Sequence, residues 1–291
     1  PRAQLYHEPN FLPFRFPGPT VITAHDLSWL RYPQAHPADR VAVMNRRFPR
    51  ALEVAAHVIT DADYTREEII AQFGISPDRI SSVPLGAREN FHPRLESECQ
   101  VVLSQRSLSY RGYVLCVGTL EPRKNLELVI HAYAAMPEAY RTRRPLVLVG
   151  MKGWLTSGLE SLMQPLVAAG QIRPQGYISD EELAALYAAA QVLVYPSLYE
   201  GFGLPPLEAM ASGTPVIVSD RSTLPEVVGE AGVQIDAADE SGLCAALRRF
   251  NEDAAWWNAR AVASLAQAQR FSWARCARET LGVYRKVLDE A

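Results

Sequence analysis

Two glutamates on either side of a glycine-rich turn form the residue group in this chain that is best suited to chemistry. Glu200 and Glu208 enclose the run Gly201-Phe202-Gly203-Leu204-Pro205-Pro206-Leu207. The preceding Val192 to Pro196 is apolar, which predicts a buried parallel strand, and Leu207 to Ala211 predicts the helix that follows. Ligands of open parallel sheets bind beyond the carboxyl ends of the strands, so we expect both carboxylates to accept hydrogen bonds from ligand hydroxyl groups. The alternative is a strand-to-helix turn with solvated carboxylates.

The glycines and prolines of this turn have separate expected tasks. Gly201 and Gly203 can adopt backbone dihedrals that are closed to other residues, and they leave room for a ring-shaped ligand. Pro205 or Pro206 suits the first turn of a helix, where the backbone N–H needs no partner. The pattern as a whole favours a binding turn over a purely structural one.

Six segments occur in the order and approximate spacing of a known family. Together they resemble the signature of family 4 of the retaining nucleotide-sugar glycosyltransferases, which have the two-domain GT-B fold. The resemblance extends over nearly the full chain. The segments are His25-Asp26-Leu27-Ser28, Val83-Pro84-Leu85-Gly86, Val117 to Asn125, Gly176 to Asp180, Glu200 to Glu208 and Ser212 to Val216.

A second group places two cations beside an expected helix start. Arg123 and Lys124 follow an apolar strand that ends at Gly118, and Asn125 is expected to cap a helix beginning at Leu126. A departing diphosphate gains negative charge, and fixed cations at that point can lower the barrier by several kcal/mol. The arginine fork and the lysine point charge together suit a pyrophosphate. A solvated basic loop is the alternative for this pair in isolation.

The resemblance implies a role for each of these residues. Arg123 and Lys124 would bind the donor pyrophosphate, Glu200 with the backbone that follows it would hold the donor sugar, and Glu208 would hold the ribose. The Tyr177-Ile178 backbone would face the base, although a core position is an equal alternative for Tyr177. The expected donor-binding residues are Gly118, Tyr177, Ile178, Gly201, Phe202, Gly203, Leu204 and Glu208, and the expected catalytic residues are His25, Arg123, Lys124 and Glu200.

His25 follows the apolar strand Thr20 to Ala24 and therefore lies at another carboxyl end. It could bond a donor hydroxyl, or contact the acceptor and assist its proton. A lone histidine is more often structural, but the match to the family's His-Asp-Leu-Ser favours a ligand role. Asp26 could orient the imidazole or cap the following turn, and we favour the cap.

The Asp61-Ala62-Asp63 segment matches the metal-binding pattern of the other major glycosyltransferase fold. Two oxygens on a short loop are too few to define a magnesium site. The resembling family has a serine where Ala62 stands, so any contact made by that serine is in doubt here. We expect no metal and no other cofactor.

Composition agrees with a soluble enzyme, and the cysteine pattern predicts a cytoplasmic one. A net charge of -3 and a pI near 6.1 argue against a nucleic-acid partner. The four cysteines have no paired spacing typical of zinc or redox sites, which predicts reduced thiols. No apolar run is long enough to cross a membrane and no signal peptide opens the chain.

The alternation of apolar strands and helical runs predicts an α/β protein with two Rossmann-like, doubly wound parallel-sheet domains. We expect a partial N-terminal acceptor-side domain over 1–93, a donor domain over 94–270, and a helix over 271–291 that crosses back to the N-terminal domain, as the resemblance implies. Pro93 to Arg111 has the composition of a linker. Because the chain opens with Pro1 and few strands precede residue 93, we expect a missing N-terminal segment. The expected strands are Thr20 to Ala24, His57 to Thr60, Ile80 to Pro84, Tyr113 to Gly118, Leu146 to Gly150, Gln171 to Tyr177, Val192 to Pro196, Pro215 to Ser219 and Gly232 to Ile235.

A basic helix is expected near residue 45. Its cations are Arg40, Arg46, Arg47 and Arg50, and its apolar residues are Val41, Met44, Phe48, Leu52 and Ala55. A solvated basic face is the default interpretation. Weak contact with anionic lipid head groups on the inner face of the membrane is the alternative.

The resemblance, together with the two groups of site residues, implies a retaining hexosyltransferase that uses a nucleotide-sugar donor and a glycan or lipid-linked glycan acceptor. The acceptor hydroxyl would attack from the face that the phosphate leaves, and a phosphate oxygen would receive its proton. Three segments resemble, in sequence, bacterial transferases of mannose or rhamnose in surface polysaccharide assembly. They are His25 to Pro33, Gly153-Trp154 and Leu204 to Ala211. GDP-mannose is the first expected donor and dTDP-rhamnose the second. The alternatives are a donor-binding fragment without turnover and a nucleotide-sugar epimerase on the same fold.

Overall fold

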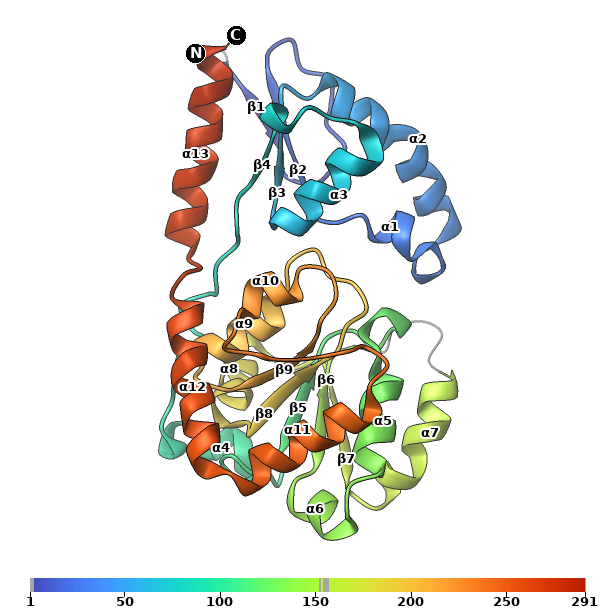
Figure 1. Cartoon of the computed structure of the whole chain (residues 1–291), viewed down its shortest axis with the longest axis vertical. Helices are drawn as coiled ribbons and strands as arrows, with labels where there is room; N and C mark the ends of the chain where they lie inside the picture. Colours follow the sequence, from blue (N-terminus) through green and yellow to red (C-terminus); the bar gives the residue numbers. More distant parts are fainter. Residues whose placement is uncertain (1–2, 152, 154–156, 291) are drawn as a thin grey trace. The chain divides into compact units, whose positions relative to one another are not determined.

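The computed structural model describes residues 3–151, 153 and 157–290 as an α/β protein (Figure 1). Trp154, of the Gly153-Trp154 pair, lies outside the described residues. The chain divides into two compact units. The first comprises Pro1–Gly86, Tyr199–Phe202 and Phe271–Ala291, and the second comprises Ala87–Leu198 and Gly203–Arg270.

The first unit is built on a parallel sheet of four strands in the order β1-β2-β3-β4. The strands are β1 (Tyr6–Glu8), β2 (Thr20–Ala24), β3 (His57–Thr60) and β4 (Ile80–Ser82). Its helices are α1 (Ser28–Arg31), α2 (Ala38–Val54), α3 (Asp63–Phe73) and α13 (Trp273–Asp289), with short 3₁₀ turns at Pro33–Ala35 and Pro77–Arg79. The strand β1 was not expected, because its three half-buried residues form no apolar run.

Both faces of this sheet are buried, as the apolar strands predict. Alternate residues of β2 and β3 pack on opposite sides because side chains in a strand have a period of two. Ile22 and Val58 join the cluster formed with α2, whereas Val21 and Ile59 join the cluster formed with α13. The helix α13 contributes its buried residues at an i, i+4 spacing, and Figure 1 shows it alongside this sheet.

The second unit has a parallel sheet of six strands in the order β10-β9-β8-β5-β6-β7. The strands are β5 (Val114–Val117), β6 (Leu146–Val149), β7 (Ile172–Gly176), β8 (Val192–Tyr195), β9 (Val216–Ser219) and β10 (Val233–Ile235). From β5 the chain adds β6 and β7 on one side and β8, β9 and β10 on the other. The order therefore reverses between β5 and β8, which is where doubly wound sheets bind ligands.

Helices cover both faces of this second sheet (Figure 1). One group packs around α5, and the other packs around α8 and α9. The first group is α5 (Leu126–Ala134), α6 (Glu138–Arg143), α7 (Ser157–Ala168) and α11 (Glu240–Glu252), and the second is α4 (Glu96–Gln105), α8 (Asp180–Ala189), α9 (Leu204–Ala211), α10 (Leu224–Val228) and α12 (Ala254–Ala268). No helix among the described residues is long and apolar enough to cross a membrane.

The expected linker over Pro93 to Arg111 is wrong, because most of it forms α4. Cys99 and Leu103 are buried four residues apart and give this helix its inner face against α8. The polar residues that suggested a linker occupy the outer face. A short helix with only two buried positions carries too weak a periodicity to be recognised from composition.

Candidate functional site

Two loops are joined at the point where the order of the second sheet reverses. β5 and β8 are parallel neighbours, so the segments that follow them emerge at the same edge. The Lys124 amino group donates a hydrogen bond of 2.6 Å to the hydroxyl of Tyr195, the last residue of β8. The backbone N–H of Leu198 donates to the carbonyl of Arg123 at 2.8 Å. The expected cations and the glycine-rich turn therefore follow adjacent strands.

Arg123 and Lys124 lie on a 3₁₀ turn, Pro122–Lys124. The guanidinium of Arg123 forms an ion pair of 2.6 Å with Glu121, and both side chains are largely buried, with exposures of 16% and 6%. This role of Glu121 was not predicted, because nothing in the neighbouring sequence marks it as the ion-pair partner of Arg123. The pairing fixes the arginine on a rigid turn rather than leaving it as a solvated basic loop.

Gly118 has a backbone conformation that other residues rarely adopt. Its φ is 139°, a region that favours glycine, and an added Cβ would lie 3.4 Å from the Lys124 side chain. Gly118 and Lys124 also line a small cavity of about 10 Å³ beyond β5, β6 and β8, with room for about one water molecule. The residue therefore lies directly beside the lysine.

Asn125 does not cap the following helix, contrary to expectation. It has a left-handed φ of 54° and makes no side-chain cap. Its amide nitrogen instead donates to the carbonyl oxygens of Pro196 at 3.2 Å and Ala237 at 2.8 Å. Asparagine tolerates this conformation better than most residues. Its side chain thus links the loops that follow β5, β8 and β10.

Glu208 lies within α9 and is buried, with an exposure of 8%. One guanidinium nitrogen of Arg88 lies 3.6 Å from its carboxylate. The buried hydroxyl of Tyr187 adjoins the same carboxylate but makes no well-formed hydrogen bond among the described residues. Burial raises the pKa of Glu208 to about 7, against the opposing influence of Arg88.

The two glycines of the turn are required for different reasons. Gly203 has a φ of 115° and precedes α9, which begins at Leu204, three residues earlier than expected, with prolines in its first turn as predicted. Gly201 is not among the residues with positive φ. An added Cβ there would lie 2.2 Å from the carbonyl oxygen of His25, so close backbone approach, and not an unusual dihedral, requires this glycine.

Tyr199–Phe202, the segment just before Gly203, belongs to the first unit. The Tyr199 hydroxyl donates to the Glu68 carboxylate at 2.6 Å and accepts from the Leu27 backbone at 2.9 Å. Glu200 is buried, and the ring of Phe202 packs edge-on against Phe271. The turn that carries Glu200 is therefore ordered by specific contacts.

His25 has partners on both ring nitrogens. Nδ1 lies 2.7 Å from the Asp61 carboxylate and Nε2 lies 2.8 Å from the carbonyl of Pro9. Since a carbonyl oxygen only accepts, Nε2 carries a proton. Burial alone would lower the pKa of His25, but the Asp61 hydrogen bond and charge, with the Pro9 carbonyl, raise it above its usual value. Asp26 caps the turn by accepting from the backbone and hydroxyl of Ser28, at 2.9 and 2.8 Å, as favoured.

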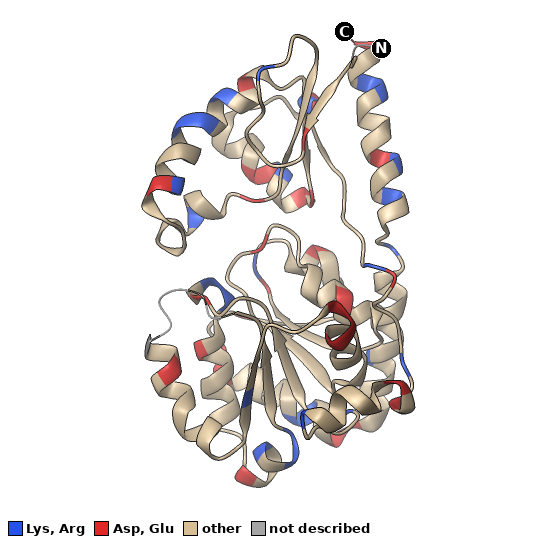
Figure 2. Ribbon diagram, turned by 180° about the vertical axis from the view of Figure 1, so that it is seen from behind, with Lys and Arg blue, Asp and Glu red and all other residues tan. Residues whose placement is uncertain are grey.

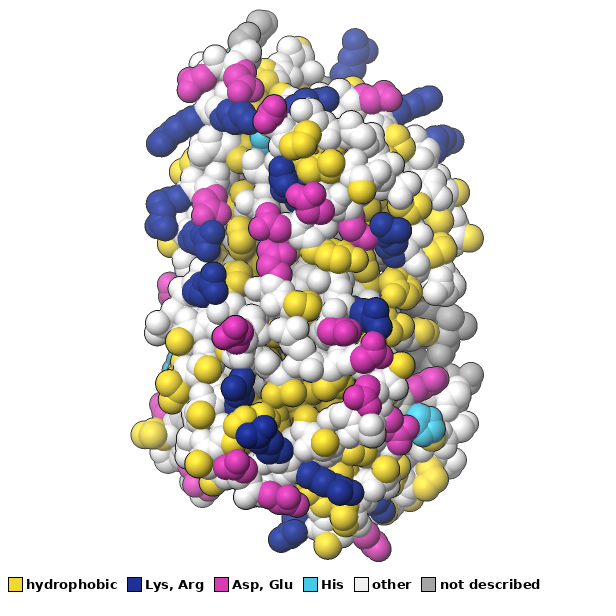
Figure 3. All heavy atoms as spheres, in the orientation of Figure 1, with side chains coloured by type: hydrophobic (Ala, Val, Ile, Leu, Met, Phe, Trp, Pro, Cys, Tyr) yellow, Lys and Arg dark blue, Asp and Glu magenta, His cyan; other side chains and the backbone are white. Residues whose placement is uncertain are grey.

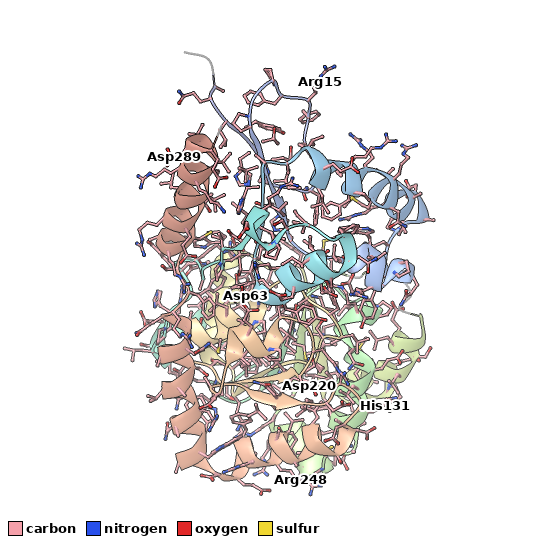
Figure 4. All side chains as sticks on the ribbon, turned by 45° about the horizontal axis from the view of Figure 1, so that its top comes forward. Arg15, Asp63, His131, Asp220, Arg248 and Asp289 are labelled. Carbon is pink, nitrogen blue, oxygen red and sulfur yellow. The ribbon has the colours of Figure 1, made fainter. Side chains whose placement is uncertain are left out.

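Asp61 is thus the residue that orients the histidine, a role the sequence did not reveal. The other aspartate of its segment, Asp63, is labelled in Figure 4 and begins α3. Among the described residues, no group of three or more His, Cys, Asp and Glu side chains could hold a metal ion.

Tyr177 follows β7, which is separated from β5 by β6. Its side chain is 79% exposed, so the alternative of a core position is wrong. Ile178 beside it is half-buried. The structure thus places both residues at the same sheet edge as Lys124, but two strands away.

Comparison with known proteins identifies the family. The family described as glycosyl transferases group 1 matches residues 105–266. The chain is 42% identical to the O-antigen chain mannosyltransferase B of Escherichia coli over 282 residues, which are 97% of this chain and 74% of that protein. It is 30% identical to the serotype-specific mannosyltransferase WbdA of Escherichia coli over 94% of this chain, but spans only 34% of that protein. The structure of Anabaena HepE with UDP and glucose superposes with a TM-score of 0.77 at 21% identity, covering 92% of this chain and 72% of HepE. The chain therefore belongs to the glycosyl transferases group 1 family and is a glycosyltransferase with the GT-B fold.

Proposed function

We propose that this chain is a retaining hexosyltransferase of family 4 that transfers mannose from GDP-mannose to a hydroxyl of a glycan or lipid-linked glycan. Rhamnose from dTDP-rhamnose is the second candidate. The observation that carries the proposal is the hydrogen bond between Lys124, after β5, and Tyr195, at the end of the neighbouring strand β8. It holds Lys124 at the carboxyl end of the strand that precedes the helix of Glu208. The similarity to mannosyltransferases of O-antigen synthesis supports the choice of sugar.

The proposed roles follow from position and chemistry. Arg123 and Lys124 neutralise the diphosphate, because charge develops there as the glycosidic bond breaks. Glu200, with the backbone of Gly201 to Leu204, binds the donor sugar, and Glu208 binds the ribose. Gly118 lets the backbone approach the donor, and Tyr177-Ile178 face the base. The second unit is then the donor domain and the first the acceptor-side domain.

The reaction needs no enzymic nucleophile in this proposal. The acceptor hydroxyl attacks C1 of the sugar from the face that the phosphate leaves, the bond from C1 to the phosphate oxygen breaks, and that oxygen takes the hydroxyl proton. His25 assists from its fixed position beside Asp61. No metal takes part, so we expect transfer to persist in excess EDTA.

A transfer assay with a donor panel tests the proposal. Thermal shifts identify the donor, because a ligand that binds only the folded state stabilises it. We expect GDP-mannose to raise the melting temperature and to support transfer to a mannan-like acceptor with an α-configured product, read by NMR of the anomeric proton. Binding without turnover would support a donor-binding fragment, and conversion of the donor to an epimer would support an epimerase.

The basic helix α2 supports a further proposed contact, with an anionic membrane surface. Figure 2 shows Lys and Arg along this helix, and in Figure 3 cationic side chains project at the edge where α2 lies. Its buried residues include Met44, Phe48 and Leu52, as expected. Phe14 is 80% exposed, and its neighbours Leu12 and Pro13 adjoin Arg47 and Arg50. Cosedimentation with vesicles containing anionic lipid, compared with neutral vesicles, tests this contact.

A further inference from the structure

We infer that Arg88 is a positioning residue that holds the Glu208 carboxylate in place and ionised for the ribose of the donor. This inference rests on the proposed role of Glu208. Arg88 belongs to none of the expected site residues, and it lies on the segment before α4, 120 positions from its partner by residue number.

The geometry makes Arg88 a bridge between two carboxylates. One guanidinium nitrogen lies 2.5 Å from Asp180, and the other lies 3.3 Å from Asp180 and 3.6 Å from Glu208. The aspartate side chain is 61% exposed, whereas that of Glu208 is 10% exposed. The solvent-exposed Asp180 therefore holds the guanidinium of Arg88, and one nitrogen of that guanidinium also faces the buried Glu208.

Aromatic side chains also contact the guanidinium of Arg88. Its Cζ lies over the ring of Phe91, 4.9 Å from the ring centre, and Phe91 packs edge-on against Tyr187 with ring centroids 5.5 Å apart. Tyr187 is fully buried on α8 and adjoins Glu208. Arg88, Phe91, Tyr187 and Glu208 thus form a closed ring of contacts. Lysine could supply the charge but not the two nitrogens that contact Asp180 and Glu208 together.

Glu208 needs such a partner because burial favours its neutral form. An ionised carboxylate can accept from both ribose hydroxyls of GDP-mannose, or from the single 3′-hydroxyl of the deoxyribose in dTDP-rhamnose, whereas a protonated carboxyl has lost part of that accepting capacity. Among the residues that the structure describes, Arg88, Tyr187 and Asp180 act on Glu208, and Arg88 is the cation of these three. The other charged or titratable side chains on the elements packed against α9 are Glu181, Glu182, Tyr195, Glu226 and Arg260.

The test measures GDP-mannose and dTDP-rhamnose binding by calorimetry from pH 6 to pH 9. These diesters have no phosphate group that titrates in this range. For the parent, we expect affinity to rise with pH through about 7 and then level. In Arg88→Gln the midpoint should move upward by about one pH unit, because an opposite charge at this distance shifts a carboxyl pKa by about that much. Affinity should fall several-fold at pH 7 and recover at pH 9.

Arg94→Gln is the matched control. Arg94 forms an ion pair of 2.6 Å with Glu181, which lies next to Asp180 on α8. The midpoint of this variant should equal that of the parent. A midpoint unchanged in Arg88→Gln, with affinity reduced equally at every pH, would overturn the inference and leave Arg88 a structural residue. Glu208→Gln separates the two proposals: it should bind weakly with no pH step. If it binds like the parent, the ribose role fails, and the inference fails with it.

Discussion

The amino group of Lys124 lies 2.6 Å from the hydroxyl of Tyr195, and it also lies 4.9 Å from the centre of that ring. The tyrosine ends β8 and the lysine ends the turn after β5, so this contact joins the two central strands at the reversal of strand order. A flexible lysine is thereby held at the edge of the sheet where parallel α/β proteins bind ligands.

Gly201→Ala should destabilise the protein by about 1 to 3 kcal/mol, because its Cβ would lie 2.2 Å from the His25 carbonyl oxygen. Gly282→Ala in α13 is the control, since an added Cβ there meets nothing within 4 Å. We expect that control to gain about 0.5 to 1 kcal/mol. Urea denaturation measures both. Equal stability of Gly201→Ala and the parent would show that the turn does not approach His25 so closely.

Asp61→Asn should lower the pKa of His25 by about one unit or more, because the amide can still accept from Nδ1 but carries no charge. The imidazole resonances in NMR titrations of the parent and the variant report this directly. An unchanged His25 titration would mean that Asp61 does not hold the proton on the ring.

Glu208→Gln should stabilise the unliganded protein at pH 8 but not at pH 5. Burial raises the pKa of Glu208 to about 7 in the folded state, from 4.5 for an exposed glutamate, so the folded state takes up the proton more readily. Stability of the parent therefore falls as pH rises from about 4.5 to 7, and glutamine removes that loss. The gain at pH 8 should be about 1 to 3 kcal/mol. The same difference at both pH values would exclude ionisation as its cause.

His57 should weaken the fold in acid. Burial, with Lys286 and Arg79, lowers its pKa to about 4, while the unfolded chain titrates near 6.5. The unfolded state binds more protons between these values, so stability falls as pH decreases from about 6.5 to 4. His57→Gln should reduce the free energy of unfolding that is lost between pH 6.5 and pH 4 by about 1 to 3 kcal/mol. His131, exposed on α5 and labelled in Figure 4, supplies the control substitution His131→Gln. An equal slope in both variants would contradict the assignment.

The strands and the strand-end motifs were predictable because they are local. Each apolar run places a strand, and a motif that follows it in sequence must lie at its carboxyl end, which located Lys124 and Glu208. The partners of these motifs were not predictable. His25 meets Asp61 across 36 residues, and Arg88 meets Asp180 across 92, so only the folded chain pairs them.

Short elements also escaped prediction. In α4 only Cys99 and Leu103 are buried, and β1 has no buried residue at all. Asn125 has the residue type of a helix cap, yet its amide bonds two distant carbonyl groups instead. In each case tertiary contacts, which the local sequence does not encode, decided the outcome.

Calorimetry at pH 8 with a nucleoside diphosphate and its nucleoside, GDP with guanosine and dTDP with thymidine, tests most directly whether Lys124 and Glu208 act on one ligand. The parent should prefer the diphosphate of one pair. Lys124→Ala should lose about 10- to 100-fold of affinity for that diphosphate and almost none for its nucleoside, because a charge-assisted hydrogen bond contributes about 1.5 to 3 kcal/mol. Glu208→Ala should weaken both. If both variants bind all four compounds as the parent does, the two residues do not share a donor site.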